Sequence, residues 1–162
     1  MRLKLFIPFL LFQLQISSNV FCQKIGLCNE VLIDHKGVQL NNDSLRNGVS
    51  VFIITSYTCG YCIKSIPLYN DLRKNFPLVS FVGILNNDSS FIEQFKTKYS
   101  KEFWFPKIPD TDLKLSKRYW KKTVWPEYHI YNNGKLVKRL VDASDKTYNK
   151  LNEILKELQT KN

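Results

Sequence analysis

Two cysteines three residues apart stand where an apolar, β-branched run gives way to a helical pattern. The run Val49–Thr55 predicts a strand covered on both faces, and the pattern after the cysteines continues to about Asn75. A cysteine at the start of a helix lies beside unpaired backbone N–H groups, which stabilise a thiolate. A second cysteine one turn later is close enough to form a disulfide. The spacing therefore favours a redox-active pair formed by Cys59 and Cys62.

The first 22 residues read as a secretory signal. They begin with positive charge, continue through the apolar run Leu5–Phe12 and offer a cleavage site before Gln23. The run has the length of the apolar central region of a signal peptide and is short for a transmembrane helix. A lipoprotein signal acylated at Cys22 and an uncleaved membrane anchor are the alternatives. All three predict a periplasmic or other extracytoplasmic location for the domain of residues 23–162, where disulfides persist.

Composition limits the class of protein. A chain of 162 residues with 44% hydrophobic residues is long enough for one globular domain with its own core. The formal net charge of +10 could favour acidic partners or anionic membranes, but no base-reading motif accompanies it. We therefore expect a well-solvated basic surface and no nucleic-acid partner.

The remaining sequence predicts strands and helices in alternation, followed by a hairpin and a closing helix. Expected strands span 30–33, 38–40, 49–55, 78–85, 127–131 and 135–141, with a weaker candidate at 103–105, and expected helices span 63–75, 90–99, 109–120 and 145–158. The first two strands would form a small hairpin, and Asn132-Asn133-Gly134 is a strong turn signal for the last one. This order predicts an α/β fold with a central mixed sheet flanked by helices.

The pattern resembles the thioredoxin-like fold, and more closely the exported TlpA/ResA-type thiol–disulfide oxidoreductases of the redoxin group. The resemblance covers about residues 29–160. It is carried by the Cys59–Cys62 motif, by Pro67 where such helices kink, and by Trp125-Pro126 before the last hairpin. In this fold, a cis-proline loop at that last position faces the active site.

The resemblance implies dithiol exchange without a cofactor or a metal. Cys59 would attack a substrate disulfide, with a thiol pKa below the usual value of about 8.5, and Cys62 would resolve the mixed disulfide. The backbone at Trp125, next to Pro126, would pair with the substrate chain, and the side chains of Trp125 and Tyr61 would supply apolar contact. Protein disulfides and a thiol electron donor are the implied partners of a monomeric enzyme, most simply a reductase.

The sequence departs from the family at three positions. Thr58 replaces a tryptophan, and Ile53 and Ser65 replace acids that assist proton transfer to the buried cysteine. The dipeptide Gly60-Tyr61 resembles that of periplasmic disulfide isomerases. An oxidase or isomerase therefore remains an alternative, as does a non-catalytic binding module.

The same sequence allows several other interpretations. A redoxin-type peroxidase would need threonine where Ser56 stands, and a fixed disulfide remains open. A zinc site needs about four ligands, whereas the two histidines, His35 and His129, lack paired spacing, so we expect no metal. Cys28 is unpaired unless Cys22 is retained and forms a disulfide with it.

The basic residues near Trp120 predict a solvated helix face with its aromatic side chains turned inward. These residues are Lys114, Lys117, Arg118, Lys121 and Lys122.

Overall fold

A computed structural model describes residue 27 and residues 30–99, 102–119 and 124–160. Its centre is a five-stranded sheet in the order β3-β2-β1-β4-β5. Strand β1 pairs parallel to β2, which pairs parallel to β3, while β4 pairs antiparallel to both β1 and β5. The strands are β1 (Val49–Thr55), β2 (Ser80–Leu85), β3 (Lys107–Pro109), β4 (Glu127–Asn132) and β5 (Lys135–Val141). The predicted mixed sheet flanked by helices is confirmed.

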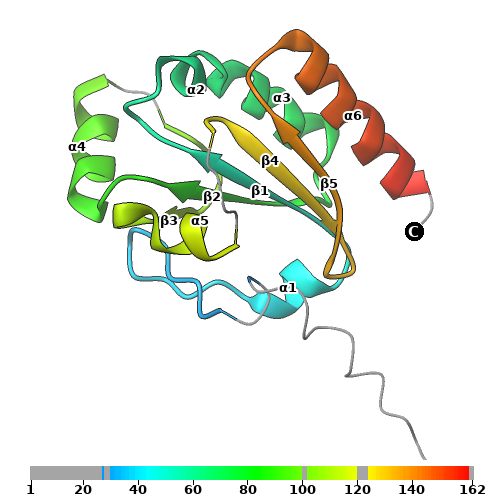
Figure 1. Cartoon of the computed structure of the whole chain (residues 1–162), viewed down its shortest axis with the longest axis horizontal. Coiled ribbons are helices and arrows are strands. Elements are labelled where there is room, and N and C mark those ends of the chain that lie inside the picture. The colour runs from blue at the N-terminus through cyan, green and yellow to red at the C-terminus, as the bar shows by residue number, and fades with distance from the viewer. Residues whose placement is uncertain (1–26, 28–29, 100–101, 120–123, 161–162) are drawn as a thin grey trace, which may run out of the picture.

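Helices cover both faces of this sheet (Figure 1). One layer holds α2 (Gly60–Lys64), α3 (Ile66–Asn75) and α6 (Asp145–Thr160), and the other holds α1 (Asn42–Arg46) and α5 (Lys114–Tyr119), while α4 (Ser89–Tyr99) flanks the β3 side. Within the described ranges, no helix is long and apolar enough to span a membrane.

The alternation of side chains along β1 divides the core in two. Val51 and Ile53 point to the layer with α3 and α6, and Phe52 and Ile54 point to the opposite layer. Every residue of β1 is buried, as its nearly continuous run of β-forming residues predicts. The strand is therefore a fixed base for the loop that follows Thr55.

The helix after the cysteines is interrupted where Pro67 predicts a kink. It is divided into α2 and α3 at Ser65, and Pro67 occupies the first turn of α3, where the absence of its N–H removes no helical hydrogen bond. The break separates the short helix that carries the cysteines from the longer one that packs on the sheet.

The third strand lies at Lys107–Pro109 and not at 103–105, so that strand assignment is wrong. Phe103 and Phe105 are buried in the core of the α3 layer instead. The strand was hard to foresee because it has three residues and begins with a lysine that is buried. Lys107 is buried because its ammonium group donates to Glu102 and to the Phe103 carbonyl oxygen.

The expected N-terminal hairpin is present only as a tight turn with one bridge, between Ile33 and Gln39. A carboxylate oxygen of Asp34 accepts hydrogen bonds from the backbone N–H groups of Lys36 and Val38, and Gly37 adopts a positive φ of 83°. The side chain of Asp34 thus accepts hydrogen bonds from backbone N–H groups that would bond to backbone carbonyl groups in a longer hairpin.

Candidate functional site

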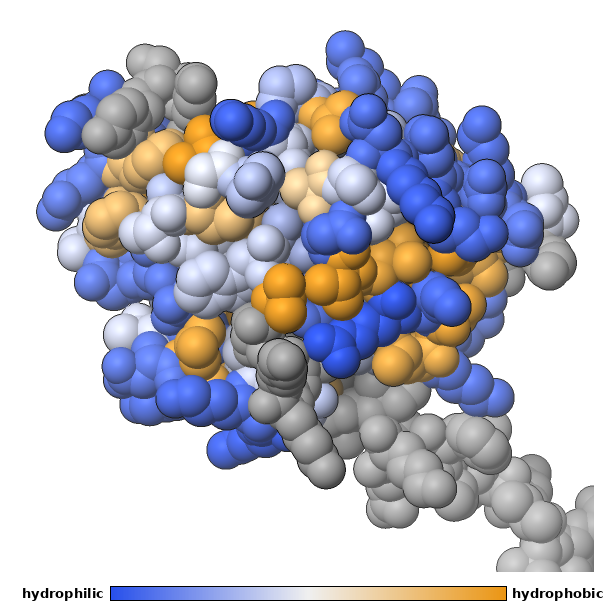
Figure 2. All heavy atoms as spheres, turned by 45° about the horizontal axis from the view of Figure 1, so that its top comes forward, coloured by the Kyte–Doolittle hydropathy of each residue, from blue (hydrophilic) through white to orange (hydrophobic). Residues whose placement is uncertain are grey.

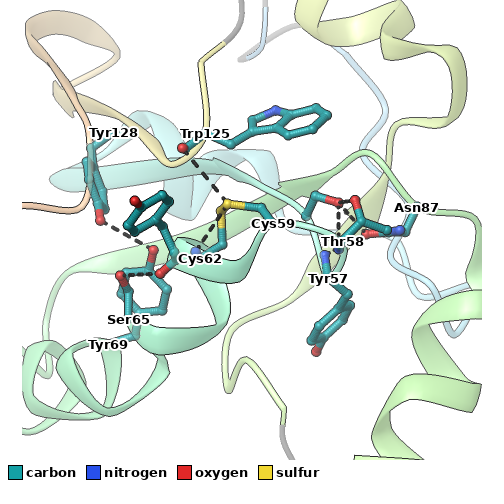
Figure 3. Close-up of a disulfide and its surroundings, with 11 residues drawn as sticks. Tyr57, Thr58, Cys59, Cys62, Ser65, Tyr69, Asn87, Trp125 and Tyr128 are labelled. Carbon is teal, nitrogen blue, oxygen red and sulfur yellow. Dashed lines mark hydrogen bonds between the residues drawn. A yellow bond between two sulfur atoms is a disulfide. The ribbon is translucent and has the colours of Figure 1, made fainter.

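Cys59 and Cys62 form a disulfide at the start of α2, with 5.2 Å between their Cα atoms. Cys59 is the N-cap of this helix, and its Sγ accepts a hydrogen bond from the backbone N–H of Cys62 at 3.2 Å (Figure 3). Cys62 is fully buried, whereas Cys59 is partly exposed. The N-cap position and the exposure therefore both distinguish Cys59 as the accessible sulfur and Cys62 as the internal one.

The loop before β4 faces this disulfide. Its Trp125–Pro126 peptide bond is cis, and the carbonyl oxygen of Trp125 lies 3.9 Å from the Sγ of Cys59. Figure 3 shows the indole ring of Trp125 extending away from the sulfurs, so that its backbone meets Cys59. Pro126 is buried beside it. The structure thus brings the two predicted segments together, although Trp125 presents a backbone atom to the sulfur.

A hydrogen-bond network that the sequence did not predict fixes the loop before Cys59. The Oδ1 atom of Asn87 accepts from the backbone N–H of Tyr57 at 2.9 Å and from the hydroxyl of Ser56 at 3.2 Å. The Ser56 hydroxyl is also 2.7 Å from the hydroxyl of Thr58 (Figure 3). Asn87 follows β2, which is adjacent to β1, so the sheet brings its amide under the loop. For Asn87, the sequence signal was limited to the polar run that follows the β2 strand.

Buried hydroxyl groups link the two positions where the family resemblance implies acids. Ser65 donates to the Tyr61 carbonyl oxygen at 3.0 Å and also hydrogen-bonds to Tyr69, whose hydroxyl is 3.3 Å from that of Tyr128 (Figure 3). Tyr128 lies opposite Ile53 in the β1–β4 register. Burial raises the pKa of Tyr69 to about 12 and also raises the pKa of Tyr128, so both stay neutral.

A cleft of about 390 Å³ lies beside the disulfide. Tyr61, 71% exposed, and Val124, 41% exposed, line it together with Trp125 and three residues of the β5–α6 loop, Asp142, Ala143 and Ser144. The sequence identified Tyr61 and Trp125 but missed the loop, because only the β4–β5 register places it here. The backbone N–H of Asp142 donates to the Pro126 carbonyl oxygen at 3.0 Å. The cleft is mostly apolar and open to solvent.

A buried ionic cluster lies on the opposite face of the sheet. Glu127, directly after the cis-proline, contacts His129 and Arg139, whose Nη2 donates to its Oε2 at 2.9 Å. Burial alone would raise the pKa of Glu127, but these two partners outweigh it and hold the pKa below its ordinary value. Glu127 pairs with Ile54 across the sheet, so it faces the layer opposite the one that contains Cys62. His129 is a packed histidine, as expected for a strand position.

The other candidate residues lie apart from the disulfide or outside the described ranges. Tyr119 packs inward and its hydroxyl contacts Glu30, which Arg118 also binds at 2.7 Å. Lys114, Lys117 and Arg118 are exposed, so the described part of this helix has the predicted solvated face. Cys22, Cys28, Trp120, Lys121 and Lys122 lie outside the described residues. In the ranges that the structure describes, no group of three or more His, Cys, Asp or Glu side chains could hold a metal ion.

Comparison with solved structures identifies the fold. The chain is similar to a secreted Mycobacterium tuberculosis disulfide oxidoreductase homologous to E. coli DsbE, with a TM-score of 0.66 and 20% identity over 81% of this chain and 97% of that one. A putative thiol:disulfide interchange protein DsbE from Chlorobium tepidum aligns with a TM-score of 0.67 and 19% identity, over 78% and 91% of the two chains.

StoA from Bacillus subtilis is similar as well, with a TM-score of 0.58 and 18% identity over 76% of this chain and 93% of that one. No model of a known protein family and no curated protein matches the sequence. The similarity in structure therefore shows that the chain has the thioredoxin-like fold that the sequence predicts.

Proposed function

We propose that this protein is an exported thiol–disulfide oxidoreductase that reduces protein disulfides through Cys59 and Cys62. The thiolate of Cys59 attacks one sulfur of the substrate disulfide, and the other substrate sulfur leaves as a thiolate and takes up a proton. Cys62 then loses its proton and attacks the Sγ of Cys59. The Cys59–Cys62 disulfide forms, the second substrate thiol is released, and two electrons have passed to the substrate. A thiol donor regenerates the pair.

One observation carries this proposal. The disulfide joins a partly exposed N-cap cysteine to a fully buried cysteine, directly opposite the backbone of the cis-proline loop. An exposed attacking sulfur and an internal resolving sulfur are the two positions that dithiol exchange requires. A purely structural staple would need neither the exposure of Cys59 nor an open cleft beside it.

The surroundings of the pair support particular roles for three further residues. We assign pairing with an extended substrate chain, as in strand addition, to the backbone at Trp125, because its carbonyl oxygen lies 3.9 Å from the Sγ of Cys59. Tyr61 and Val124 offer apolar contact in the cleft. The Ser65 hydroxyl already hydrogen-bonds to the Tyr61 carbonyl oxygen and to Tyr69. We therefore propose that water accepts the proton of Cys62.

We propose that the domain of residues 23–162 acts outside the cytosol and as a monomer. This proposal is supported by the signal-like composition of residues 1–22 and by the secreted oxidoreductase among the similar structures. Removal of the leader gives a free domain, whereas its retention or acylation would attach the domain to a membrane through its N-terminus.

Reduction of insulin disulfides by a thiol donor tests the activity. The wild-type domain is expected to accelerate the reaction, the Cys59→Ser variant to lose the acceleration, and the Cys28→Ser variant to keep it. Full activity of the Cys59→Ser variant would contradict the proposal. Equilibration with glutathione then tests the direction. A potential near that of thioredoxin, about −270 mV, supports reduction, whereas one near that of DsbA, about −120 mV, supports oxidation.

A further inference from the structure

The outer strand β5 carries an unusual surface for a strand. It is the last strand in the sheet order, and the five residues Lys135–Arg139 are all exposed. Leu136 is 50% exposed and Val137 is 45% exposed. Figure 2 shows this face, where apolar side chains form a stripe interleaved with hydrophilic ones. An exposed apolar stripe of this kind is a typical mark of an interaction site.

The charge of this strand is of one sign. Three of its seven residues, Lys135, Lys138 and Arg139, are basic, and it contains no acid. Arg139 is bound by the buried Glu127, whereas Lys138 is within the exposed stretch. A docked chain would therefore meet apolar surface flanked by positive charge.

The strand leads directly to the proposed exchange site. Its last residue, Val141, pairs with Glu127, the residue after the cis-proline. The next residue, Asp142, is bonded to the Pro126 carbonyl oxygen and lines the cleft beside the disulfide. Val124 also lines this cleft and adds a further exposed apolar side chain. The surface of β5 and the cleft are therefore continuous.

We infer that β5 is a docking strand for an extended, acidic segment of the protein substrate, an inference that rests on the proposed function. The segment would lie along Leu136–Val141, centred on Lys138, while the substrate cysteine reaches Cys59. Acidic side chains would pair with Lys138, and apolar ones would cover Leu136 and Val137.

Two features of the strand select such an occupant. Lys138 pairs with Ile130 of β4, and Leu136 pairs with the next residue, Tyr131. Val137 is therefore an extra residue that forms a β-bulge. Bulges and lysines keep edge strands from pairing with any available strand. A second copy of β5 would bring its own lysines against Lys138, and like charges on paired strands repel. An acidic segment is the strand that this edge accepts.

The geometry also sets a length. Three residue steps along the strand, about 10 Å, lead from Lys138 to Val141. A strand added outside β5 lies three strand spacings of about 4.8 Å from β1, which carries the cysteine loop. The straight path across both displacements is roughly 18 Å, which an extended chain needs about six residues to cover. The acidic segment should therefore be centred about six residues from the reactive cysteine.

Synthetic peptides joined by a disulfide test this inference. Each carries either a Glu-Val-Glu-Leu-Glu segment or the same segment with Gln for Glu, centred six residues before or after the cysteine. At low ionic strength, the wild-type enzyme should show a KM about fivefold lower for one Glu peptide than for its Gln counterpart, with kcat unchanged and the difference lost in 0.5 M salt. The Lys138→Glu variant should abolish this preference, and Leu136→Ser should raise KM for both peptides.

The matched control is Lys156→Glu, which makes the same charge change on an exposed position of α6. Equal effects of Lys138→Glu and Lys156→Glu, or equal KM values of wild type for Glu and Gln peptides, would overturn the docking strand. Turnover of neutral hydroxyethyl disulfide separates the two hypotheses, because its absence contradicts the proposed function alone. Binding of the Glu peptides to the Cys59→Ser variant, followed by fluorescence anisotropy, then tests docking without catalysis, and a failure to prefer Glu over Gln overturns it.

Discussion

The carbonyl oxygen of Trp125 lies 3.9 Å from the Sγ of Cys59, so a backbone atom of the cis-proline loop, and not the indole ring, is next to the accessible sulfur. The loop that carries Cys59 and the loop that carries Trp125 are held by different groups. Asn87 fixes the first, and the bond from Asp142 to Pro126 fixes the second. The relation between sulfur and carbonyl therefore depends on residues outside the cysteine motif.

Asn87→Ala should loosen the cysteine loop. The substitution removes the acceptor of the Tyr57 N–H and the Ser56 hydroxyl and leaves a buried donor unpaired, which costs about 1–3 kcal/mol of unfolding free energy. Urea denaturation measures this loss. Asn86→Ala is the matched control. Because the loop positions Cys59, disulfide exchange by Asn87→Ala should also slow in conditions where the protein is fully folded, and unchanged exchange there would contradict a positioning role.

Gly83→Ala should overfill the core beneath β2. A Cβ atom at this position would lie 2.5 Å from the Phe105 Cε2 atom, well inside contact distance. Overpacking of this kind typically costs about 1–3 kcal/mol. Gly60→Ala is the control, because a Cβ atom there meets nothing within 4 Å. Thermal unfolding of the two variants measures the difference, and equal midpoints would show that Phe105 can move aside.

The free energy of unfolding should depend on Glu127 at acidic pH. His129 and Arg139 hold its pKa below the ordinary 4.5, so the folded state favours the ionised form. That contribution is complete above the unfolded pKa of about 4.5 and is lost as pH falls through the lower folded pKa. Acid titration of unfolding free energy should therefore be shallower in Glu127→Gln than in wild type below about pH 4.5.

Glu157→Gln, on an exposed position of α6, is the matched control for this titration. It should retain the wild-type slope. Identical slopes for Glu127→Gln and wild type would mean that the cluster with His129 and Arg139 contributes no net preference for the ionised carboxylate.

The leader should be removed on export. The full chain is expressed in a bacterial host, and the extracytoplasmic product is analysed by mass spectrometry. Its mass should be that of a chain whose first residue is Gln23. A mass with a lipid adduct on Cys22 would support the lipoprotein alternative, and the full-length mass in a membrane fraction would support an anchor.

Much of the fold could be predicted because it depends on local patterns. The β-branched run Val49–Thr55, the Asn133-Gly134 turn and Pro67 each act on their own neighbours, and the structure follows them. The strand at Lys107 could not be predicted, because its lysine is buried, and burial of the charge depends on Glu102 and the Phe103 carbonyl oxygen.

The candidate site divides in the same way. The cysteine spacing and the Trp125-Pro126 pair are visible in the sequence, and the structure brings them together. Asn87 and the Asp142–Ser144 loop are not, because each reaches the site only through strand pairing: Asn87 through β1 with β2, and the loop through β4 with β5. Contacts that arise from strand pairing join residues far apart in the sequence, so no local sequence pattern predicts them.

Trapping of the exchange intermediate tests the central claim most directly. The Cys62→Ser variant, incubated with a peptide disulfide, should accumulate a mixed disulfide on Cys59, because the resolving thiol is missing and the attacking thiol remains. Mass spectrometry of the digested protein locates the bond, and Cys59→Ser under the same conditions should accumulate little. Equal trapping in the two variants, or a mixed disulfide on Cys62 alone, would contradict the assignment of Cys59 as the nucleophile.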